Sequence, residues 1–214
     1  MHYIKMKKEG KRDKFFLDLF GIIFFTLGIL AVLNSFYLKN PAQILWLCYL
    51  SLVIIGFGIL KRNSFLIMSQ IYILAIPLLA WDIDFVYYLI TQSSLWGITD
   101  YFFAQDVFNL GRIISLQHLF TIPISIYSVY LIGLKRRDAW KLSAAQIVFI
   151  FILVNLFVPN NININCVYNP CVNFSLGLDF LPYQITWFLV FFLMVLAAHF
   201  LLNSLLVSNN KLQL

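Results

Sequence analysis

The amino-acid sequence predicts an all-α polytopic membrane protein with six transmembrane helices and both termini in the cytoplasm. Of its 214 residues, 62% are hydrophobic and only 11% are charged, whereas roughly 25% of the residues in an average soluble domain are charged. Thirteen of the fifteen Lys and Arg residues fall on one side when the apolar segments are folded into a membrane. Because short basic loops stay in the cytoplasm, this side is expected to be the inner one. Only Lys39 and Arg112 lie on the other side.

The apolar segments are long enough to cross a hydrocarbon core of ~30 Å. The first follows six basic residues, as in a signal peptide, but it is too long for such a segment and lacks a small-residue cleavage site. We therefore expect a single membrane domain over residues 15–208, between a basic tail (1–14) and a short C-terminal tail (209–214), both cytoplasmic. The expected spans are Phe15–Leu38, Ala42–Leu60, Ser64–Tyr88, Arg112–Leu134, Leu142–Val158 and Gln184–Val207.

Two long loops, Leu89–Gly111 and Pro159–Tyr183, face outward in this topology. Pro77 and Pro123 interrupt the third and fourth spans, where a proline usually kinks the helix. The net charge of +6 comes from bases beside the span ends, where topology and anionic headgroups account for them. Membrane lipids are therefore the expected partners, and nucleic acid is not.

Polar groups collect in the outer half of the predicted bilayer. Cys48 in the second span and His118 in the fourth both lie roughly 9 Å below the outer boundary, at 1.5 Å per residue. Asp84 lies where the third span reaches that boundary, and Asn155 lies one turn below the outer end of the fifth. Ionisable groups in a membrane are costly and point to function by default. For Asp84, an interfacial structural role is an equal alternative.

His118 has polar neighbours at helical spacing. Ser115, Thr121, Ser125 and Ser128 recur with it every three or four residues, which places them on one face of the fourth span. That face is expected to point into the bundle, with His118 as a functional group and Ser115 and Thr121 as substrate contacts. Interhelical hydrogen bonding or small-residue packing would produce the same stripe.

Cys48 is the candidate nucleophile. A thiol is a strong nucleophile when a neighbouring His removes its proton and a carboxylate or amide orients the ring. Cys48, His118 and Asp84 form the predicted catalytic group, with Asn155 as the alternative orienting residue. A buried free Cys that acts only as a small hydrophobic residue is the competing interpretation.

The second outer loop is rich in asparagine and contains two cysteines. Asn and Pro favour turns, and side-chain amides can satisfy a loop that folds back over a site. We expect Asn163 and Asn165, together with Asn155 and Trp46, to contact substrate. Cys166 and Cys171 are expected to form a disulfide, because four intervening residues with an Asn-Pro pair can close the ring in an oxidising compartment. Two free thiols are the alternative.

Several chemistries are excluded by the residues present. Three histidines, one of them near the N-terminus, do not make a three-His zinc site, and no His-x-x-His motif occurs. No Gly-rich phosphate loop or Gly-x-Ser-x-Gly elbow is present. No metal or cofactor is therefore expected. The two halves also lack the inverted repeats typical of secondary transporters.

The chain resembles a broad six-span superfamily. The resemblance rests on six spans with both ends inside, on His118 followed by Pro123 in the fourth span, and on the Asn-rich segment Asn163–Tyr168. The superfamily contains the androgen-induced lipid hydrolases, a related eukaryotic membrane acyltransferase family and small bacterial and archaeal membrane proteins. The small bacterial and archaeal members are the ones to which the chain is most similar, so we expect a multi-pass protein of a bacterial or archaeal inner membrane. The resemblance also implies a His paired with a Thr or Cys nucleophile. These map onto His118 and Cys48, although the second span has no Thr.

Three functions follow as hypotheses. The first is an outward-facing pocket for a lipid or other amphiphile, with hydrolysis or transfer of an acyl group by Cys48 and His118. The second is a proton-coupled carrier in which Asp84 and His118 titrate. The third is a non-catalytic membrane scaffold, in which the polar stripe only joins helices.

Overall fold

The computed structural model describes residues 10–104, 109–134, 136–173 and 181–211. Over these residues the chain is helical and contains no strand, which confirms the predicted all-α class. The helices are α1 (Lys11–Tyr37), η1 (Pro41–Leu45), α2 (Leu47–Leu60), α3 (Ser64–Thr91), α4 (Asp100–Phe103), α5 (Leu110–Ser115), α6 (His118–Ile132), α7 (Trp140–Phe157), η2 (Ile164–Cys166) and α8 (Tyr183–Lys211).

Within this described part, five helical segments are long and apolar enough to cross a membrane. They correspond to five of the six expected spans, with ends that differ by a few residues. This pattern is that of a multi-pass membrane protein. The five segments are Lys11–Tyr37, Ser64–Thr91, Leu110–Ile132, Trp140–Phe157 and Tyr183–Ser204.

The expected second span, Ala42–Leu60, is not one continuous helix. Pro41 starts the short 3-10 helix η1, and Trp46 then adopts an extended backbone (φ −59°, ψ 123°) before α2 begins. The 14 residues of α2 reach only ~21 Å at 1.5 Å per residue. This length is less than the ~30 Å of a hydrocarbon core.

The fourth segment is also divided. α5 ends at Ser115 and α6 begins at His118, with a turn between them in which the amide of Gln117 donates to Ile114 O (3.1 Å), a 3-10 hydrogen bond. Pro123, inside α6, has no N–H to donate to the carbonyl of the preceding helical turn. The break places His118 at the first position of α6.

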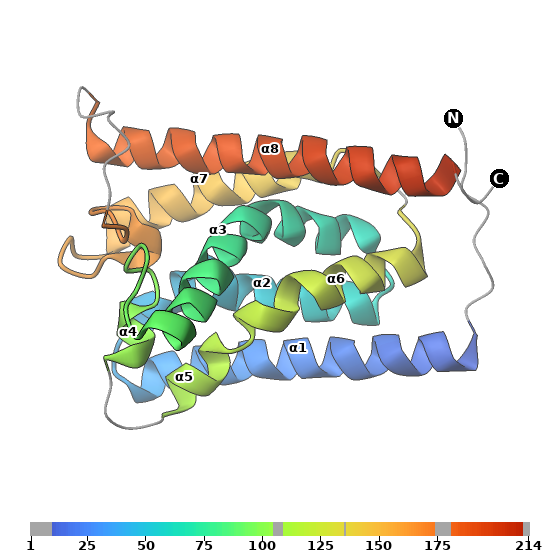
Figure 1. Ribbon diagram of the computed structural model, residues 1–214, viewed down its shortest axis with the longest axis horizontal. Coiled ribbons are helices and arrows are strands. Elements are labelled where there is room, and N and C mark those ends of the chain that lie inside the picture. Colours follow the sequence, from blue (N-terminus) through green and yellow to red (C-terminus); the bar gives the residue numbers. More distant parts are fainter. Residues whose placement is uncertain (1–9, 105–108, 135, 174–180, 212–214) are drawn as a thin grey trace.

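α3 is the centre of the bundle. It is the most deeply buried of the five long segments and contacts α2, α6, α7 and α8. α1 packs mainly on α2. Figure 1 shows α3 crossing between α8 on one side and α1 on the other, with the start of α1 and the end of α8 at the same end of the bundle.

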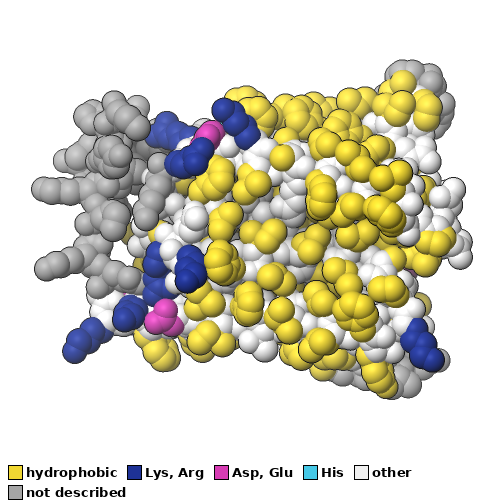
Figure 2. Space-filling view, turned by 180° about the vertical axis from the view of Figure 1, so that it is seen from behind, with side chains coloured by type: hydrophobic (Ala, Val, Ile, Leu, Met, Phe, Trp, Pro, Cys, Tyr) yellow, Lys and Arg dark blue, Asp and Glu magenta, His cyan; other side chains and the backbone are white. Residues whose placement is uncertain are grey.

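The two ends of the bundle differ in charge. The end at which α1 starts also holds the α2–α3 and α6–α7 connections, which contain Lys61, Arg62, Arg136 and Arg137. Figure 2 shows Lys and Arg side chains gathered toward this end, beside a flank covered by hydrophobic side chains. We call it the basic end. The opposite end, formed by η1, α4, α5 and η2, is the loop end.

Two glycines allow α1 and α2 to pack closely. A Cβ built on Gly56 would lie 2.4 Å from Phe25 N, and one on Gly28 would lie 2.8 Å from Val53 N. Because these neighbours are backbone atoms, they cannot rotate away. Small residues at a helix interface permit this close approach in membrane proteins.

We predict that Gly56→Ala lowers the free energy of unfolding by about 1–3 kcal/mol, as overpacking does in other interiors. Thermal unfolding of the detergent-solubilised protein measures the loss. Gly10→Ala is the control, since its added methyl would lie no closer than 3.5 Å to Asp13. Equal melting temperatures for Gly56→Ala and Gly10→Ala would show that the helices do not approach in this way.

Candidate functional site

His118 lies in an aromatic and polar cluster near the loop end. Its ring meets the Trp81 ring of α3 edge to face, with centroids 4.7 Å apart. Trp81 Nε1 donates to the hydroxyl of Tyr101 in α4 (3.1 Å), and Tyr101 donates to Ser115 Oγ at the end of α5 (3.3 Å). His118 is 7% exposed, and its buried Nδ1 has no hydrogen-bond partner.

The structure does not join the predicted nucleophile to His118. Cys48 is a half-buried free cysteine in the first turn of α2, and no hydrogen bond links the described side chains of Cys48 and His118. Burial raises the pKa of Tyr101, hydrogen bonds with Ser115 and Trp81 oppose this rise, and the proximity of Cys48 adds to it.

Asp84 anchors a loop. Its carboxylate accepts hydrogen bonds from Leu95 N (2.8 Å), Trp96 N (2.7 Å), and both N and Oγ1 of Thr99 (2.8 Å each). A carboxylate has about four acceptor positions, so none remains to orient the His118 ring. The fully buried Asp84 ties the segment after α3 back onto the end of that helix. This arrangement favours the structural interpretation over the catalytic one.

Asn165 also has a structural role, because its side chain holds the break before α2. Its Nδ2 donates to Leu45 O (2.8 Å), and its Oδ1 accepts from Leu47 N (2.9 Å), so its amide spans Trp46 at the break before α2. Its own carbonyl accepts from Trp187 Nε1 of α8 (2.6 Å). Asn165 has φ 52°, a left-handed conformation that asparagine tolerates better than most residues. The amide is thus fully used within the protein.

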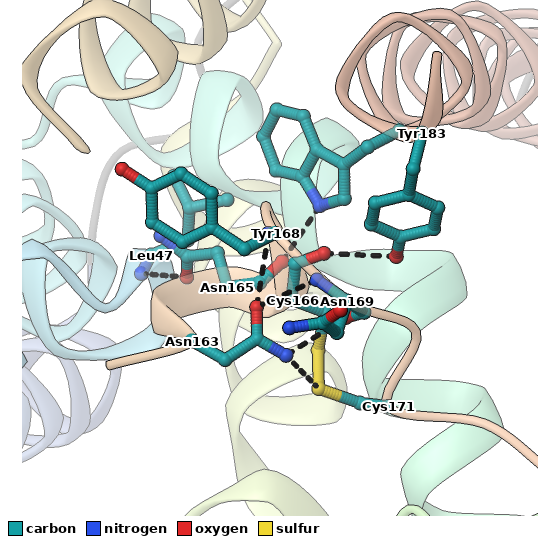
Figure 3. Close-up of a disulfide and its surroundings, with 9 residues drawn as sticks. Leu47, Asn163, Asn165, Cys166, Tyr168, Asn169, Cys171 and Tyr183 are labelled. Atoms are coloured by element: carbon teal, nitrogen blue, oxygen red, sulfur yellow. Dashed lines mark hydrogen bonds between the residues drawn. A yellow bond between two sulfur atoms is a disulfide. The ribbon is translucent and has the colours of Figure 1, made fainter. Parts of the chain in front are cut away.

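Figure 3 shows the same loop around its disulfide. Cys166 and Cys171 are joined, with sulfur atoms 2.10 Å apart. Asn163 Oδ1 accepts from Tyr168 N (3.0 Å) and Asn169 N (3.1 Å), so this amide closes the turn within the loop. Tyr183 at the start of α8 donates to Cys166 O (2.9 Å). The loop folds back on the bundle, as expected, but Asn163 and Asn165 hold it in place instead of presenting free amides to a substrate.

The remaining predicted contacts point in different directions. Thr121 is fully buried and donates to Gln117 O one turn earlier (2.8 Å). Asn155 is exposed on α7 and donates to Phe151 O on the same helix (2.8 Å). Asn155 therefore does not face the His118 cluster, because its expected depth along the helix does not fix which face of the helix points inward. Trp46 is half-buried between the two residues that Asn165 binds.

A groove of about 540 Å³ opens at the loop end, between the α1–α2 connection and the end of α7. Its walls are mostly apolar, and Lys39 supplies one positive charge. Phe157, on one wall, is 73% exposed. The lining residues are Lys39, Asn40, Pro41, Ala42, Leu45, Phe157, Val158, Pro159 and Ile162.

Sequence reasoning missed Trp81 and Tyr101 in the His118 cluster and Lys39 in the groove. An available signal for the aromatic pair was the enrichment of Trp and Tyr at membrane interfaces. Lys39 is one of only two bases outside the basic loops. The sequence analysis used this position to orient the chain in the membrane, but it did not identify Lys39 as a binding residue. Within the described residues, no three His, Cys, Asp or Glu side chains gather as a metal-binding group.

No protein-family model matches the chain, no curated protein matches its sequence, and no solved structure matches its fold. The resemblance to the lipid-hydrolase superfamily therefore stays a prediction, and the site must be interpreted from its own geometry.

We predict that Asp84→Asn destabilises the loop end. An amide NH2 would face backbone donors, and loss of hydrogen bonds to a charged acceptor costs roughly 2–3 kcal/mol. Hydrogen exchange in residues 92–99 should rise and the melting temperature should fall. Asp82→Asn, two residues earlier, is the matched control. Asp82 Oδ1 is buried without a hydrogen-bond partner, so neutralising this carboxylate should remove no hydrogen bond at that atom. Equal exchange in the two variants would contradict the anchoring role.

For the disulfide, we predict that alkylation of the denatured, unreduced protein labels Cys48 alone, whereas alkylation after reduction labels all three cysteines. Cys48 is thus an internal control for labelling efficiency. Peptide mass spectrometry distinguishes the sites. Full alkylation of Cys166 and Cys171 without reductant would contradict the disulfide.

Proposed function

We propose that the protein is a six-span membrane protein, with its basic end in the cytoplasm, that holds an anionic amphiphile in the groove at its loop end. In this topology η1 and α2 together make the second crossing. The lipid or lipid-like molecule would place its negative group at Lys39 and its chain along the apolar walls. Membrane lipids are the partners that this proposal implies.

The observation that carries the proposal is the combination of volume, lining and position of the groove. About 540 Å³ is within the usual 300–1,000 Å³ of small-molecule sites, which are mostly apolar with a few oriented polar groups. Lys39 is exposed and is one of only two bases at this end. In the proposed topology the exposed Phe157 would put part of the groove wall against lipid, which gives an amphiphile a route from the bilayer.

The hydrogen-bond pattern favours binding over acyl transfer and over proton-coupled transport. Acyl transfer needs a base within hydrogen-bond reach of the nucleophile, and Cys48 has no such bond to His118 among the described side chains. A proton-coupled carrier needs a carboxylate that gains and loses its proton during transport, whereas Asp84 is held by four donors. We therefore propose binding without assigning a reaction.

The topology is tested with single cysteines in a Cys48→Ser background. A cysteine at Asn161, in the loop after α7, should react with a membrane-impermeant maleimide added to intact cells, and one at Arg137 should react only after lysis. The reason is the positive-inside rule. Labelling of Arg137→Cys from outside would overturn the orientation and the number of crossings.

The groove is tested by equilibrium binding of a fluorescent lysophosphatidylglycerol to the purified protein in neutral detergent. Lys39→Asn should weaken binding about fivefold, because one base near a membrane surface contributes ~1 kcal/mol toward an anionic lipid. Asparagine suits this site because Lys39 has φ 55°, and Asn tolerates left-handed backbone. Ala42→Trp, which fills the groove, should remove most of the binding.

Two variants serve as controls for this binding experiment. Lys11→Asn removes a base at the other end, and Ala145→Trp adds a ring to an exposed position of α7 outside the groove. Both should bind like the unmodified protein. Unchanged affinity in Ala42→Trp would reject the groove as the binding site.

A further inference from the structure

A second groove opens on the flank of the bundle, in the half nearer the basic end. It has a volume of about 410 Å³ and is lined by residues of α1, α2, α3 and α7. Two glutamines, Gln70 of α3 and Gln146 of α7, are the polar residues of its lining. The apolar lining consists of Phe25, Val53, Ile54, Phe57, Leu66 and Leu142.

Hydrogen bonds between α2, α3 and α7 fix the glutamines. Ser51 Oγ donates to Gln70 Oε1 (2.8 Å), and Gln70 Nε2 donates to Gln146 Oε1 and Ser69 Oγ (2.9 Å each). Gln70 is fully buried and has a partner at both ends of its amide. These hydrogen bonds account for the burial of the Gln70 amide without a ligand.

Gln146 is only half satisfied. Its Oε1 accepts from Gln70, but its buried Nε2 has no partner. In the hydrocarbon region no water is present to pair with such a donor, and an unpaired group costs several kcal/mol. The acceptors that a bilayer supplies are the ester carbonyls of its lipids, and the groove gives a lipid access to this amide.

The rim of the groove toward the basic end is positively charged. Lys61 Nζ lies 5.9 Å from the centroid of Phe57, a lining residue, and Lys141 directly precedes the lining residue Leu142. Both lysines are exposed. The acidic residues nearby are engaged elsewhere: Asp18 pairs with Arg62 (2.8 Å), and Asp138 pairs with Arg136 (2.7 Å). The guanidinium of Arg136 also holds the pKa of Asp138 below its usual value.

The vertical order of these groups matches a phospholipid. Gln146 lies five residues along α7 from Lys141, or ~7.5 Å deeper at 1.5 Å per residue. In a glycerophospholipid the ester carbonyls follow the phosphate by a few bonds in the same direction, and the acyl chains continue inward. Lysine ammonium groups extend toward the headgroup level while their stems cover apolar surface.

We propose that this groove binds an anionic phospholipid of the leaflet at the basic end. Its phosphate lies between Lys61 and Lys141, an ester carbonyl accepts from Gln146 Nε2, and an acyl chain follows the apolar lining along α2. The site is separate from the groove at the loop end. The proposal for this second groove does not depend on whether the groove at the loop end binds an amphiphile.

The test is photocrosslinking of the full-length protein in nanodiscs containing phosphatidylglycerol or phosphatidylcholine with a diazirine in the acyl chain. Crosslinked peptides identified by mass spectrometry should concentrate on the lining segments 53–57 and 142–146, with about tenfold more product from the anionic lipid. This ratio follows from two bases at ~1 kcal/mol each, less the screening by salt. Lys61→Gln with Lys141→Gln should bring the two lipids to equal yield.

Ile54, a lining residue that is not itself a member of the Ser51–Gln70–Gln146 hydrogen-bond network, is replaced in Ile54→Trp by a ring that fills the groove and should remove crosslinks at residues 142–146. Val148→Trp is its control, because Val148 is 40% exposed on α7 and does not line the groove. If Ile54→Trp fails to fold, the Lys61→Gln, Lys141→Gln variant still tests the proposal. Both lysines are exposed, so their replacement should leave the fold intact. Crosslinks spread evenly over the lipid-facing flank, or equal yields from the two lipids in the unmodified protein, would overturn the proposal.

Discussion

The requirement that buried polar groups find partners within the protein governs this fold, and α3 is where it applies most strongly. This helix contacts four others and carries a polar side chain near each end. Gln70 is satisfied by α2 and α7, and Asp84 is satisfied by the loop that follows α3. Each end of the bundle is therefore assembled around one buried side chain of the central helix. Without water in the hydrocarbon region, loss of either set of partners would leave donors unpaired.

The short α2 accounts for the shape of the loop end. Because its helix begins only at Leu47, the chain from Lys39 to Trp46 is not part of a regular span and needs other partners for its backbone. Asn165 supplies two of them, and the disulfide-closed loop brings Asn165 into place. The same irregular segment leaves the groove beside Lys39, whereas the groove nearer the basic end lies between continuous helices, with α2, α3 and α7 among its walls.

Much of the helical framework was predictable, because apolar length and charge bias act on each segment by itself. α3 begins at Ser64 as predicted, and α7 differs from its expected start and end by two residues and one. The shortening of α2 was not predicted, although Pro41 was a visible signal. Side-chain roles were predicted less well, because they depend on packing order. Depth alone placed Asn155 with His118, but it faces outward, and Asp84 could not be recognised as a loop anchor without the fold of residues 92–99. Applying the same depth argument at the basic end would have singled out Gln70 and Gln146.

We propose that a membrane protein of this topology keeps an anionic amphiphile beside Lys39. An experimental structure of the protein in phosphatidylglycerol nanodiscs tests it most directly. We expect elongated density along Ala42, Leu45 and Val158, with its polar end at Lys39. A groove closed by protein side chains, or lipid density distributed evenly around the bundle with none at Lys39, would contradict it.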